Sequence, residues 1–331
     1  MEHIKIIQGT NLADTEDVSM QVIQKLYNIA SGSTLDNTSD LQGRLHATIA
    51  YREPVEWLTT HYPNLHISVD SFAIPFEDPN MLAYLNSIGV GSNGMVTEAQ
   101  AAAATVVANS ENTTVRKFNE LKYFTGITES AGGWDVPGNG KIRFNGWTAL
   151  EEIDISNFTS IGHGGTFAVS DSFYGCTALK KVTASNKLVK FGRCVFQNCS
   201  NLEDIIGLSG TIMLENAVFN GCTKLKGASF DNCTISFYST FGESAFKQCK
   251  AITNITIDNS ITKIPKEAFY QCSALASINL GNITEIALDG FRETALTSAD
   301  LSNIITIGER AFYGCNTLVS VTMPNSAVTI A

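Results

Sequence analysis

Residues 268–278 read Ala268-Phe-Tyr-Gln-Cys-Ser-Ala-Leu-Ala-Ser-Ile278, and this stretch decides the fold because its pattern recurs along the chain. In each copy, Phe is followed three residues later by Cys, and then by Leu or Ile and further apolar residues in one register. Two copies are worn: one has Trp147 in the Cys position, and the one that begins at Phe291 has lost one residue together with the Cys. The eight copies begin at Phe144, Phe173, Phe196, Phe219, Phe246, Phe269, Phe291 and Phe312.

The spacing of the copies indicates how they fold. Successive Phe residues are 21 to 29 positions apart, and a unit of that size cannot bury an apolar face alone, so the units must stack. The Leu-x-x-Ile-x-Ile stretch is rich in β-branched residues and predicts a short strand, and the Asn-containing pairs after it predict a turn. Because stacked strands bring like residues together, we expect one ladder of Phe and one of Cys along the core.

The motif resembles that of the BspA-type leucine-rich repeat family. The resemblance rests on the stretch at 268–278, on Ile307-Gly-Glu-Arg-Ala-Phe312, and on Phe118-Asn-Glu-Leu-Lys-Tyr-Phe-Thr-Gly126, which is typical of the start of such arrays. It covers residues 116–331 and implies a leucine-rich repeat solenoid with one short strand per coil of about 23 residues and little helix. Family members are implied to act as surface adhesins or recognition modules. The sequence departs from the pattern near residues 126–143 and 207–245.

Residues 1–115 do not follow the repeat, and we expect a small α+β region there. A bare terminal coil would expose core and strand edges, so we predict that this region covers the open end of the array. The sequence patterns predict helices over 15–29, 52–62, 79–88 and 97–109, and strands over 41–51 and within 65–76.

One glycine-rich motif, Gly89-Val-Gly-Ser-Asn-Gly94, fits the dinucleotide pattern G-x-G-x-x-G. That site needs a preceding strand within a βαβ unit, whereas residues 81–88 predict a helix, so nucleotide binding is not expected. We interpret the motif as a degenerate EF-hand-like loop with Val96 as its apolar eighth residue. Two of its glycines stand where oxygen ligands belong, and Gln100 replaces the bidentate Glu, so calcium binding is not expected either.

The charge and hydropathy of the chain exclude two kinds of partner. The net charge is −10, and the 22 Lys and Arg residues are scattered, so a phosphate backbone would be repelled and no nucleic acid is expected. No segment reaches the roughly 18 apolar residues of a transmembrane helix, so no membrane insertion is expected. The N-terminus lacks the basic and apolar regions of a signal peptide. The sequence therefore predicts either a chain used without Sec export or one whose signal has been removed.

The positions of the eight cysteines favour a role in core packing over a chemical role. Six of them occupy the repeat position, which favours buried, free thiols over disulfides or zinc ligands. A local disulfide at Cys194 or Cys233 is the alternative.

No catalytic, cofactor-binding or metal-ligating residue is predicted, and the chain is not expected to be an enzyme or to need a cofactor. Gly162-His-Gly-Gly165 is similar to an oxyanion loop, but no G-x-S-x-G elbow accompanies it. The repeat carboxylates Asp154, Glu203, Asp204 and Glu285 are expected to face solvent, with nothing that marks them as catalytic.

The leading hypothesis is a non-enzymatic recognition or adhesion module that presents its repeat surface to a protein or glycan, outside the cell or on its surface. The alternative is a structural or host-recognition subunit of a phage virion, in contact with neighbouring subunits. The array stops at Ala331 partway through a coil, so we expect another subunit to cover that end or the chain to have been cut there; an oligomer is compatible with both. The first positions to examine for contacts are the strand residues Lys181, Thr183, Glu203, Thr256, Asn279 and Ser320.

Overall fold

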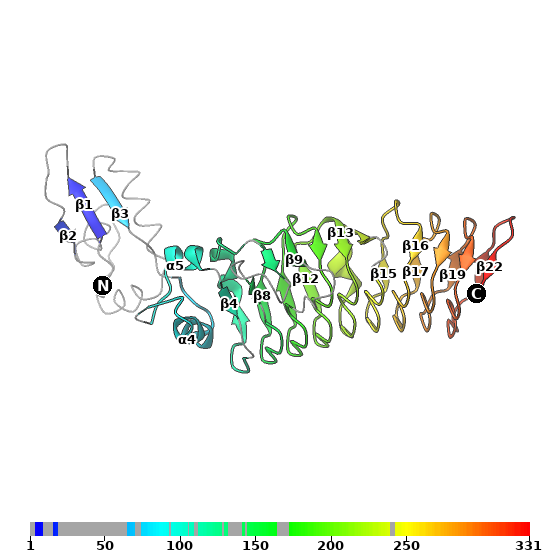
Figure 1. Cartoon of the computed structure of the whole chain (residues 1–331), viewed down its shortest axis with the longest axis horizontal. Helices are drawn as coiled ribbons and strands as arrows, with labels where there is room; N and C mark the ends of the chain where they lie inside the picture. The colour runs from blue at the N-terminus through cyan, green and yellow to red at the C-terminus, as the bar shows by residue number, and fades with distance from the viewer. Residues whose placement is uncertain are drawn as a thin grey trace, which may run out of the picture. The chain divides into compact units, whose positions relative to one another are not determined.

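The chain forms two compact units, Met1–Ala103 and Ala104–Ala331, in the computed structural model shown in Figure 1. The structure describes residues 4–8, 16–18, 65–69, 74–92, 94–104, 106–108, 112–127, 129–131, 141–142, 144–163, 172–238 and 242–331.

The first unit contains a three-stranded antiparallel sheet in the order β2-β1-β3. Its strands are β1 (Ile4–Gln8), β2 (Glu16–Val18) and β3 (Leu65–Val69). The predicted strand within 65–76 is confirmed. The helix predicted over 15–29 is wrong at Glu16–Val18, because those residues pair with β1, a partner that helical periodicity does not reveal. The remainder of that helix, and the elements predicted over 41–51 and 52–62, lie outside the described residues.

Two helices follow in the first unit. Helix α4 (Pro79–Ser87) confirms the helix predicted over 79–88, and it begins as expected of a capped helix: the Asp78 side chain accepts a hydrogen bond from the Asn80 N–H at 2.9 Å. Helix α5 (Glu98–Ala103) confirms only the first part of the helix predicted over 97–109. The later part is wrong, because Val106–Ala108 forms strand β4, in which β-branched residues pair with β7 (Lys141–Ile142).

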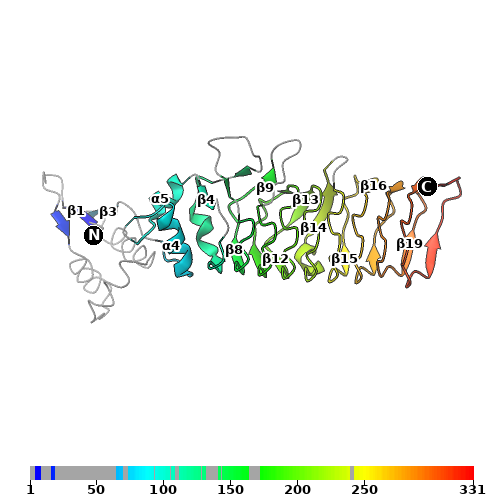
Figure 2. The same cartoon turned by 60° about the horizontal axis from the view of Figure 1, so that its bottom comes forward.

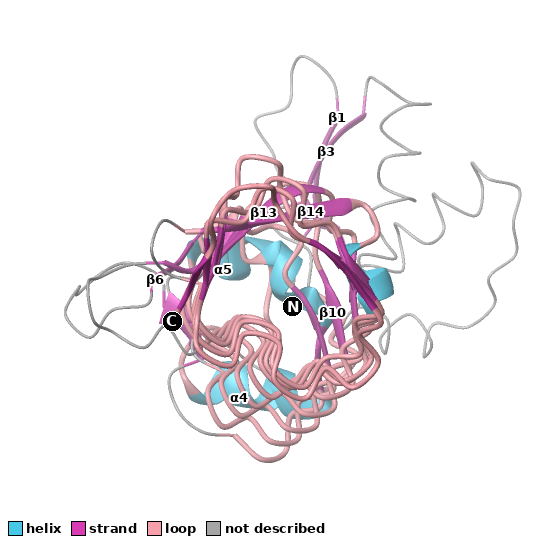
Figure 3. Cartoon of the chain, turned by 90° about the vertical axis from the view of Figure 1, so that its right-hand side faces the viewer, coloured by secondary structure: helices cyan, strands magenta, loops and turns pink. Residues whose placement is uncertain are grey.

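The second unit is the predicted solenoid, but most of its coils carry two short strands where one was predicted, and these strands build two parallel walls. Figure 2 shows β8, β12, β15 and β19 following one another along one side, and β9, β13 and β16 along the other. Figure 3, a view along the array, shows that irregular return segments close the remaining side. The strands of the first wall are β5 (Lys117–Phe118), β8 (Glu152–Asp154), β10 (Lys181–Thr183), β12 (Asp204–Ile206), β15 (Asn254–Ile255), β17 (Ser277–Ile278), β19 (Ser298–Asp300) and β21 (Ser320–Thr322).

The second wall runs beside the first and pairs in the same parallel way. Two short 3-10 helices, η2 (Asn119–Tyr123) and η3 (Gly227–Phe230), lie along the first wall at two coils. The strands of the second wall are β6 (Glu129–Ala131), β9 (Ser160–His163), β11 (Lys190–Phe191), β13 (Gly210–Leu214), β14 (Cys233–Phe237), β16 (Lys263–Ile264), β18 (Glu285–Ile286), β20 (Thr306–Ile307) and β22 (Thr329–Ile330).

The predicted Phe ladder runs through the core without interruption. The eight repeat Phe rings, from Phe144 to Phe312, form seven successive stacked pairs, with centroids 5.1 to 5.7 Å apart and planes within 21° of parallel. Seven of the eight are fully buried. The ladder therefore supplies both the apolar burial of each coil and the contact with its neighbours.

Where the structure describes them, the return segments have no helix or strand, yet their backbone is paired. In the coil of Phe196, the N–H groups of Cys194, Phe196 and Asn198 donate to carbonyls of the next coil at 2.8 to 2.9 Å. Cys194 and Asn198 can do so because both adopt a left-handed conformation, with φ of 58° and 63°. The same two positions are left-handed in coil after coil. Alternate residues thus point their N–H groups the same way along the array, and the buried polar backbone is satisfied.

The cysteines form the second predicted ladder. The thiol of Cys222 donates to the carbonyl of Phe196 in the preceding coil at 3.0 Å. The other five repeat cysteines make the same hydrogen bond to the Phe carbonyl of the preceding coil. All eight cysteines are free; seven are buried and Cys315 is half-buried. Burial raises the pKa of Cys176 to about 12 and that of Cys233 to about 11. The thiols of Cys176 and Cys233 are therefore packing groups, and their thiolates are disfavoured.

The worn copy at Phe291 differs from the expectation. The Cys position is not lost: Thr294 occupies it, is buried, and donates its N–H to the Phe291 carbonyl as the cysteines do in their own coils. The missing residue falls between Thr294 and Leu296. The Thr294 hydroxyl turns to the Phe291 carbonyl of its own coil at 2.9 Å, so the thiol bond to Phe269 is absent from the ladder.

Candidate binding surface

Three rows of side chains run along the first wall, since most coils contribute one residue to each row. Main-chain bonds keep the rows in register; for example, the Glu203 N–H donates to the Lys180 carbonyl at 2.9 Å. The first row consists of Arg116, Glu151, Lys180, Glu203, Lys226, Thr253, Ala276, Thr297 and Val319. The second consists of Lys117, Glu152, Lys181, Asp204, Asn254, Ser277, Ser298 and Ser320. The third consists of Asp154, Thr183, Ile206, Thr256, Asn279, Asp300 and Thr322.

In the part of these rows between residues 116 and 226, here called the charged half, the first and second rows alternate in sign from coil to coil. Glu151 contacts Arg116 on one side and Lys180 on the other, the latter at 2.9 Å. Lys226 lies 3.1 Å from Glu203 and 3.2 Å from Asp204. The hydrogen bond from Lys180 and then that from Arg116 hold the pKa of the Glu151 carboxyl below its ordinary value. The charges of this half therefore neutralise one another between coils.

The part between residues 253 and 322, here called the uncharged half, has only one charged residue, Asp300. All twelve side chains of its three rows are exposed. Among the described residues, the hydroxyls of Ser277, Ser298 and Ser320 make no hydrogen bond within the chain, whereas Asn279 uses its carboxamide oxygen to accept from the Gly281 N–H at 3.0 Å. This half thus offers small polar groups to solvent in a regular array.

The two halves meet where the first wall is interrupted. Strand β12 ends a four-stranded sheet, and in the next coil η3 replaces the strand, so that the Ile205 N–H donates to the Ser229 hydroxyl at 3.0 Å instead of to a backbone carbonyl. Gly227 lies close to the next coil, because a Cβ atom there would lie 2.9 Å from the Asn254 carboxamide oxygen and 3.2 Å from the Asn254 main-chain oxygen. The second wall also breaks at this level, between β14 and β16, where a single bridge joins Ile235 to Ile257.

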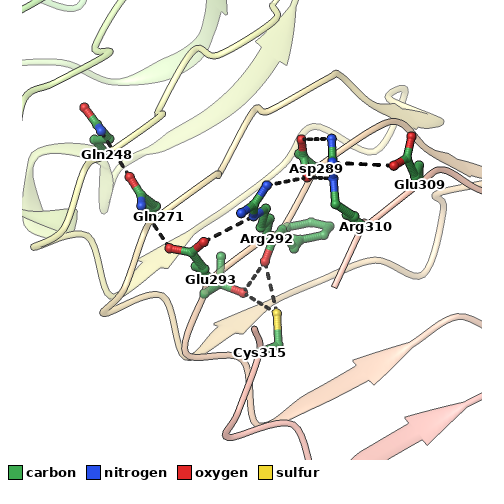
Figure 4. Close-up of polar contacts among 10 residues, drawn as sticks. Gln248, Gln271, Asp289, Arg292, Glu293, Glu309, Arg310 and Cys315 are labelled. Carbon is green, nitrogen blue, oxygen red and sulfur yellow. Dashed lines mark hydrogen bonds and ion pairs between the residues drawn. The ribbon is translucent and has the colours of Figure 1, made fainter. Parts of the chain in front are cut away.

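A separate polar cluster lies on the return segments of the last coils (Figure 4). Gln248 donates to Gln271, which donates to Glu293, with donor–acceptor distances of 3.0 and 2.9 Å. Asp289, which is buried, accepts two hydrogen bonds from Arg310 of the next coil, at 3.0 and 3.2 Å. These contacts join consecutive coils and leave no convergent group for chemistry.

Aromatic rings in the same region are also occupied by neighbours. The Arg292 guanidinium lies between the rings of Tyr270 and Tyr313, 5.0 and 5.1 Å from their centroids, and the Lys247 ammonium lies 5.0 Å from the Tyr270 ring. Cation–π contacts of this kind stabilise the stack of coils. The faces of Tyr270 are therefore covered by cations and do not form an open aromatic platform.

The six strand residues selected from the sequence all lie on the outward face of the first wall. Lys181, Thr256, Asn279 and Ser320 are exposed, while Thr183 and Glu203 are half-buried. Sequence reasoning missed the division into two halves. The signal was present, because the residue after the repeat Leu or Ile is Glu151, Lys180, Glu203 and Lys226 in four coils and then Thr253, Ala276, Thr297 and Val319.

One carboxylate does not lie where the sequence placed it. Asp154 was expected to face solvent, but it is buried, because the Lys122 ammonium approaches it at 3.9 Å and its carboxylate accepts from the Ser156 N–H at 2.9 Å. It therefore stabilises the turn after β8. Glu203, Asp204 and Glu285 are half-buried, and the side chain of His163 lies outside the described residues.

The glycine-rich loop of the first unit follows helix α4, not a strand, so the context that the dinucleotide pattern needs is absent from this described segment. The loop connects two helices, as an EF-hand loop does. The Gln100 carboxamide donates to the Ser92 hydroxyl at 3.0 Å and accepts from the Thr97 N–H at 2.9 Å. Gln100 thus fastens the loop with neutral hydrogen bonds at the position where an EF-hand has its bidentate ligand.

Among the described residues, no group of three or more His, Cys, Asp or Glu side chains converges as metal ligands would. Within the same residues, no helix is both long enough and apolar enough to span a membrane.

The architecture defines the class: a leucine-rich repeat solenoid with a Phe and a Cys ladder in its core. A family profile described as the BspA type leucine rich repeat region matches residues 140–242 and 239–331 in six copies, more than half of the chain. The chain belongs to the BspA-type leucine-rich repeat family. No curated protein matches the sequence.

Three solved structures are similar to this chain. A leucine rich cell surface protein from Faecalibacterium prausnitzii is 21% identical, with a TM-score of 0.39; the match covers 65% of this chain, which spans about half (49%) of that protein. A leucine-rich repeat protein from Bacteroides ovatus is 22% identical, with coverage of 66% and 73% and a TM-score of 0.36. One from Eubacterium ventriosum is 15% identical, with coverage of 55% and 61% and a TM-score of 0.25.

Proposed function

We propose that the solenoid is a non-enzymatic recognition module that works outside the cell or on its surface and binds a partner protein or glycan through the outward face of the first wall. The observation that carries this proposal is the contrast between core and surface. The Phe and Cys rows repeat almost unchanged, whereas the outward rows vary in charge and size on a regular backbone. Repeat arrays use such extended surfaces for binding.

Catalysis has less support. The titratable groups that lie close together, such as Asp289 with Arg310 or Glu151 with Lys180, pair with each other between coils. The thiols are buried, and burial raises the pKa of Cys176 to about 12, which disfavours a nucleophilic thiolate.

The test uses a matched pair of substitutions in the full chain. Ser298→Arg places a long cation on the first wall, and Thr262→Arg does the same at an exposed position beside the second wall. Binding is measured on two panels, one of glycans and one of extracellular proteins. We expect Ser298→Arg to weaken binding at least tenfold and Thr262→Arg to leave it unchanged. Equal losses in both variants, or no binding to either panel, would contradict the proposal.

A further inference from the structure

We infer that the contact surface for a ligand is the uncharged half of the first wall, and that the ligand is an uncharged polysaccharide lying along the coils. This inference rests on the proposed function and narrows it to one part of the wall and one class of partner.

The first step is the state of the polar groups in the two halves. In the charged half, most carboxylates and ammonium groups already bond to one another, as Lys226 does with Glu203 and Asp204. A ligand would have to break those ion pairs or desolvate them. In the uncharged half, the hydroxyls of Ser277, Ser298 and Ser320 have no partner among the described residues, so a ligand meets groups that are bonded only to water.

The second step is the chemistry that these groups accept. A serine or threonine hydroxyl both donates and accepts, and the Asn254 and Asn279 carboxamides present N–H donors, so the surface mixes donors and acceptors closely. Sugar hydroxyls also both donate and accept hydrogen bonds, so each can pair with either a donor or an acceptor on this surface. A chain of them therefore fits a row of small hydroxyls and amides.

The third step is charge. Asp300 is the only charged residue in the twelve positions, and the Ser302 N–H that bonds to its carboxylate holds its pKa below the ordinary value, which keeps it anionic. An anionic glycan or nucleic acid would meet no cation here and one repelling carboxylate. A charged group buried against this surface would exchange its hydration for neutral donors alone, with no opposite charge to offset the cost, whereas a neutral hydroxyl needs no such charge.

The fourth step separates a polysaccharide from a protein. Protein interfaces depend on a few large anchors, mostly aromatic residues and Arg, that fill pockets of the partner's surface. The twelve exposed side chains of the uncharged half include no aromatic ring, and the largest apolar one is Val319. They are small and repeat with the strands, about 4.8 Å from one coil to the next. Such a surface suits many equivalent weak contacts along an extended chain.

The experiment uses the full chain and an array of neutral, sialylated and sulfated glycans together with a panel of extracellular proteins. The test variant combines Ser277→Ala, Ser298→Ala and Ser320→Ala, which removes hydroxyls without adding bulk. The matched control, Lys181→Ala, changes an exposed residue of the charged half. Circular dichroism and the melting temperature confirm that both variants fold.

We expect binding to neutral glycans, weakened about tenfold or more in the triple variant because each lost hydrogen bond contributes modestly, and unchanged in the control. Binding confined to sialylated or sulfated glycans, or to proteins, and sensitive to Ser298→Arg, would overturn this inference and leave the proposed function standing. Neutral-glycan binding that the triple variant retains would also overturn it. Absence of any binding sensitive to the first wall would overturn both.

Discussion

The charged and uncharged halves of the first wall share one backbone but treat their side chains in opposite ways. In the charged half, outward groups such as those of Arg116, Glu151 and Lys180 bond to one another across coils. In the uncharged half, the hydroxyls of Ser277, Ser298 and Ser320 make no hydrogen bond to the described residues. The Phe ladder and the return-segment hydrogen bonds run through both halves alike. The Phe ladder and the return segments therefore do not depend on the outward residues. These residues can differ between the two halves without a change in the core.

The largest expected effect comes from breaking the core that joins the halves. Phe219 stacks between Phe196 and Phe246 at the level of the interruption, so Phe219→Ala should cost about 3–5 kcal/mol of unfolding free energy. Because repeat arrays behave as chains of neighbouring interactions, urea denaturation should then show the halves unfolding separately. Val189→Ala, at a half-exposed position, is the control and should change stability by less than about 0.5 kcal/mol. A single transition at unchanged midpoint would show that the ladder does not couple the halves.

The next effect comes from glycines at which the backbones of consecutive coils lie close together, one in each half of the array. A Cβ atom at Gly207 would lie 2.4 Å from the Ala184 carbonyl oxygen, and one at Gly308 would lie 2.7 Å from backbone atoms of Ala287 and Leu288. We expect Gly207→Ala and Gly308→Ala each to cost about 1–3 kcal/mol, measured by urea denaturation. Gly210 has a φ of +78° but open space around it, so Gly210→Ala reports the backbone strain alone. Equal losses at Gly207 and Gly210 would mean that the contact with Ala184 relaxes.

A smaller effect is expected from a substitution that completes the Cys ladder in the uncharged half. Thr294→Cys places a thiol within the row whose members donate to the Phe carbonyl of the preceding coil, here that of Phe269. We expect a gain of about 1 kcal/mol, visible as a higher melting temperature. Thr294→Ser, which lacks the thiol and also the methyl group, should not stabilise. A loss in Thr294→Cys would show that the hydroxyl bonds to Phe291 and Cys315 outweigh the restored one.

The smallest effect concerns the ion pairs of the charged half. The pKa of Glu151 is lowered in the folded chain, so its pairs stabilise the fold above its ordinary pKa of 4.5 and this stability is lost as pH falls through the lowered pKa. Glu151→Gln should therefore be less stable than the wild type at pH 7, by under about 1 kcal/mol, and equal to it in acid. The melting temperature of both proteins between pH 2 and about 7 checks this. For Ser277→Ala, in the uncharged half, the difference in melting temperature from the wild type should not change with pH.

The repeat was predictable from sequence because its core is periodic. The spacing of the Phe-x-x-Cys motif predicted the Phe and Cys ladders, and the apolar positions after each Cys predicted the strands of the first wall. Predictions failed where a distant partner decides the local structure: Glu16–Val18 and Val106–Ala108 are strands because β1 and β7 pair with them. Asp154 failed for the same reason, since Lys122 approaches it from an earlier segment.

The division of the first wall was also within reach of the sequence, but only after the coils were aligned on their strand register. Unaligned, Glu151 and Lys180 are 29 residues apart and look unrelated. The missing hydrogen bonds of Ser277 and Ser298 could not be predicted, because an outward serine can as readily bond to its own backbone. That property depends on the three-dimensional structure.

The one-way alignment of the return-segment N–H groups has a consequence for how such a protein changes over generations. In these segments each coil donates to its successor and accepts from its predecessor through the same three positions, as Cys194, Phe196 and Asn198 do. A duplicated or deleted coil would leave its neighbours facing an equivalent hydrogen-bonding edge. Unequal recombination can thus lengthen or shorten the wall by whole coils without any change in the packing of the core.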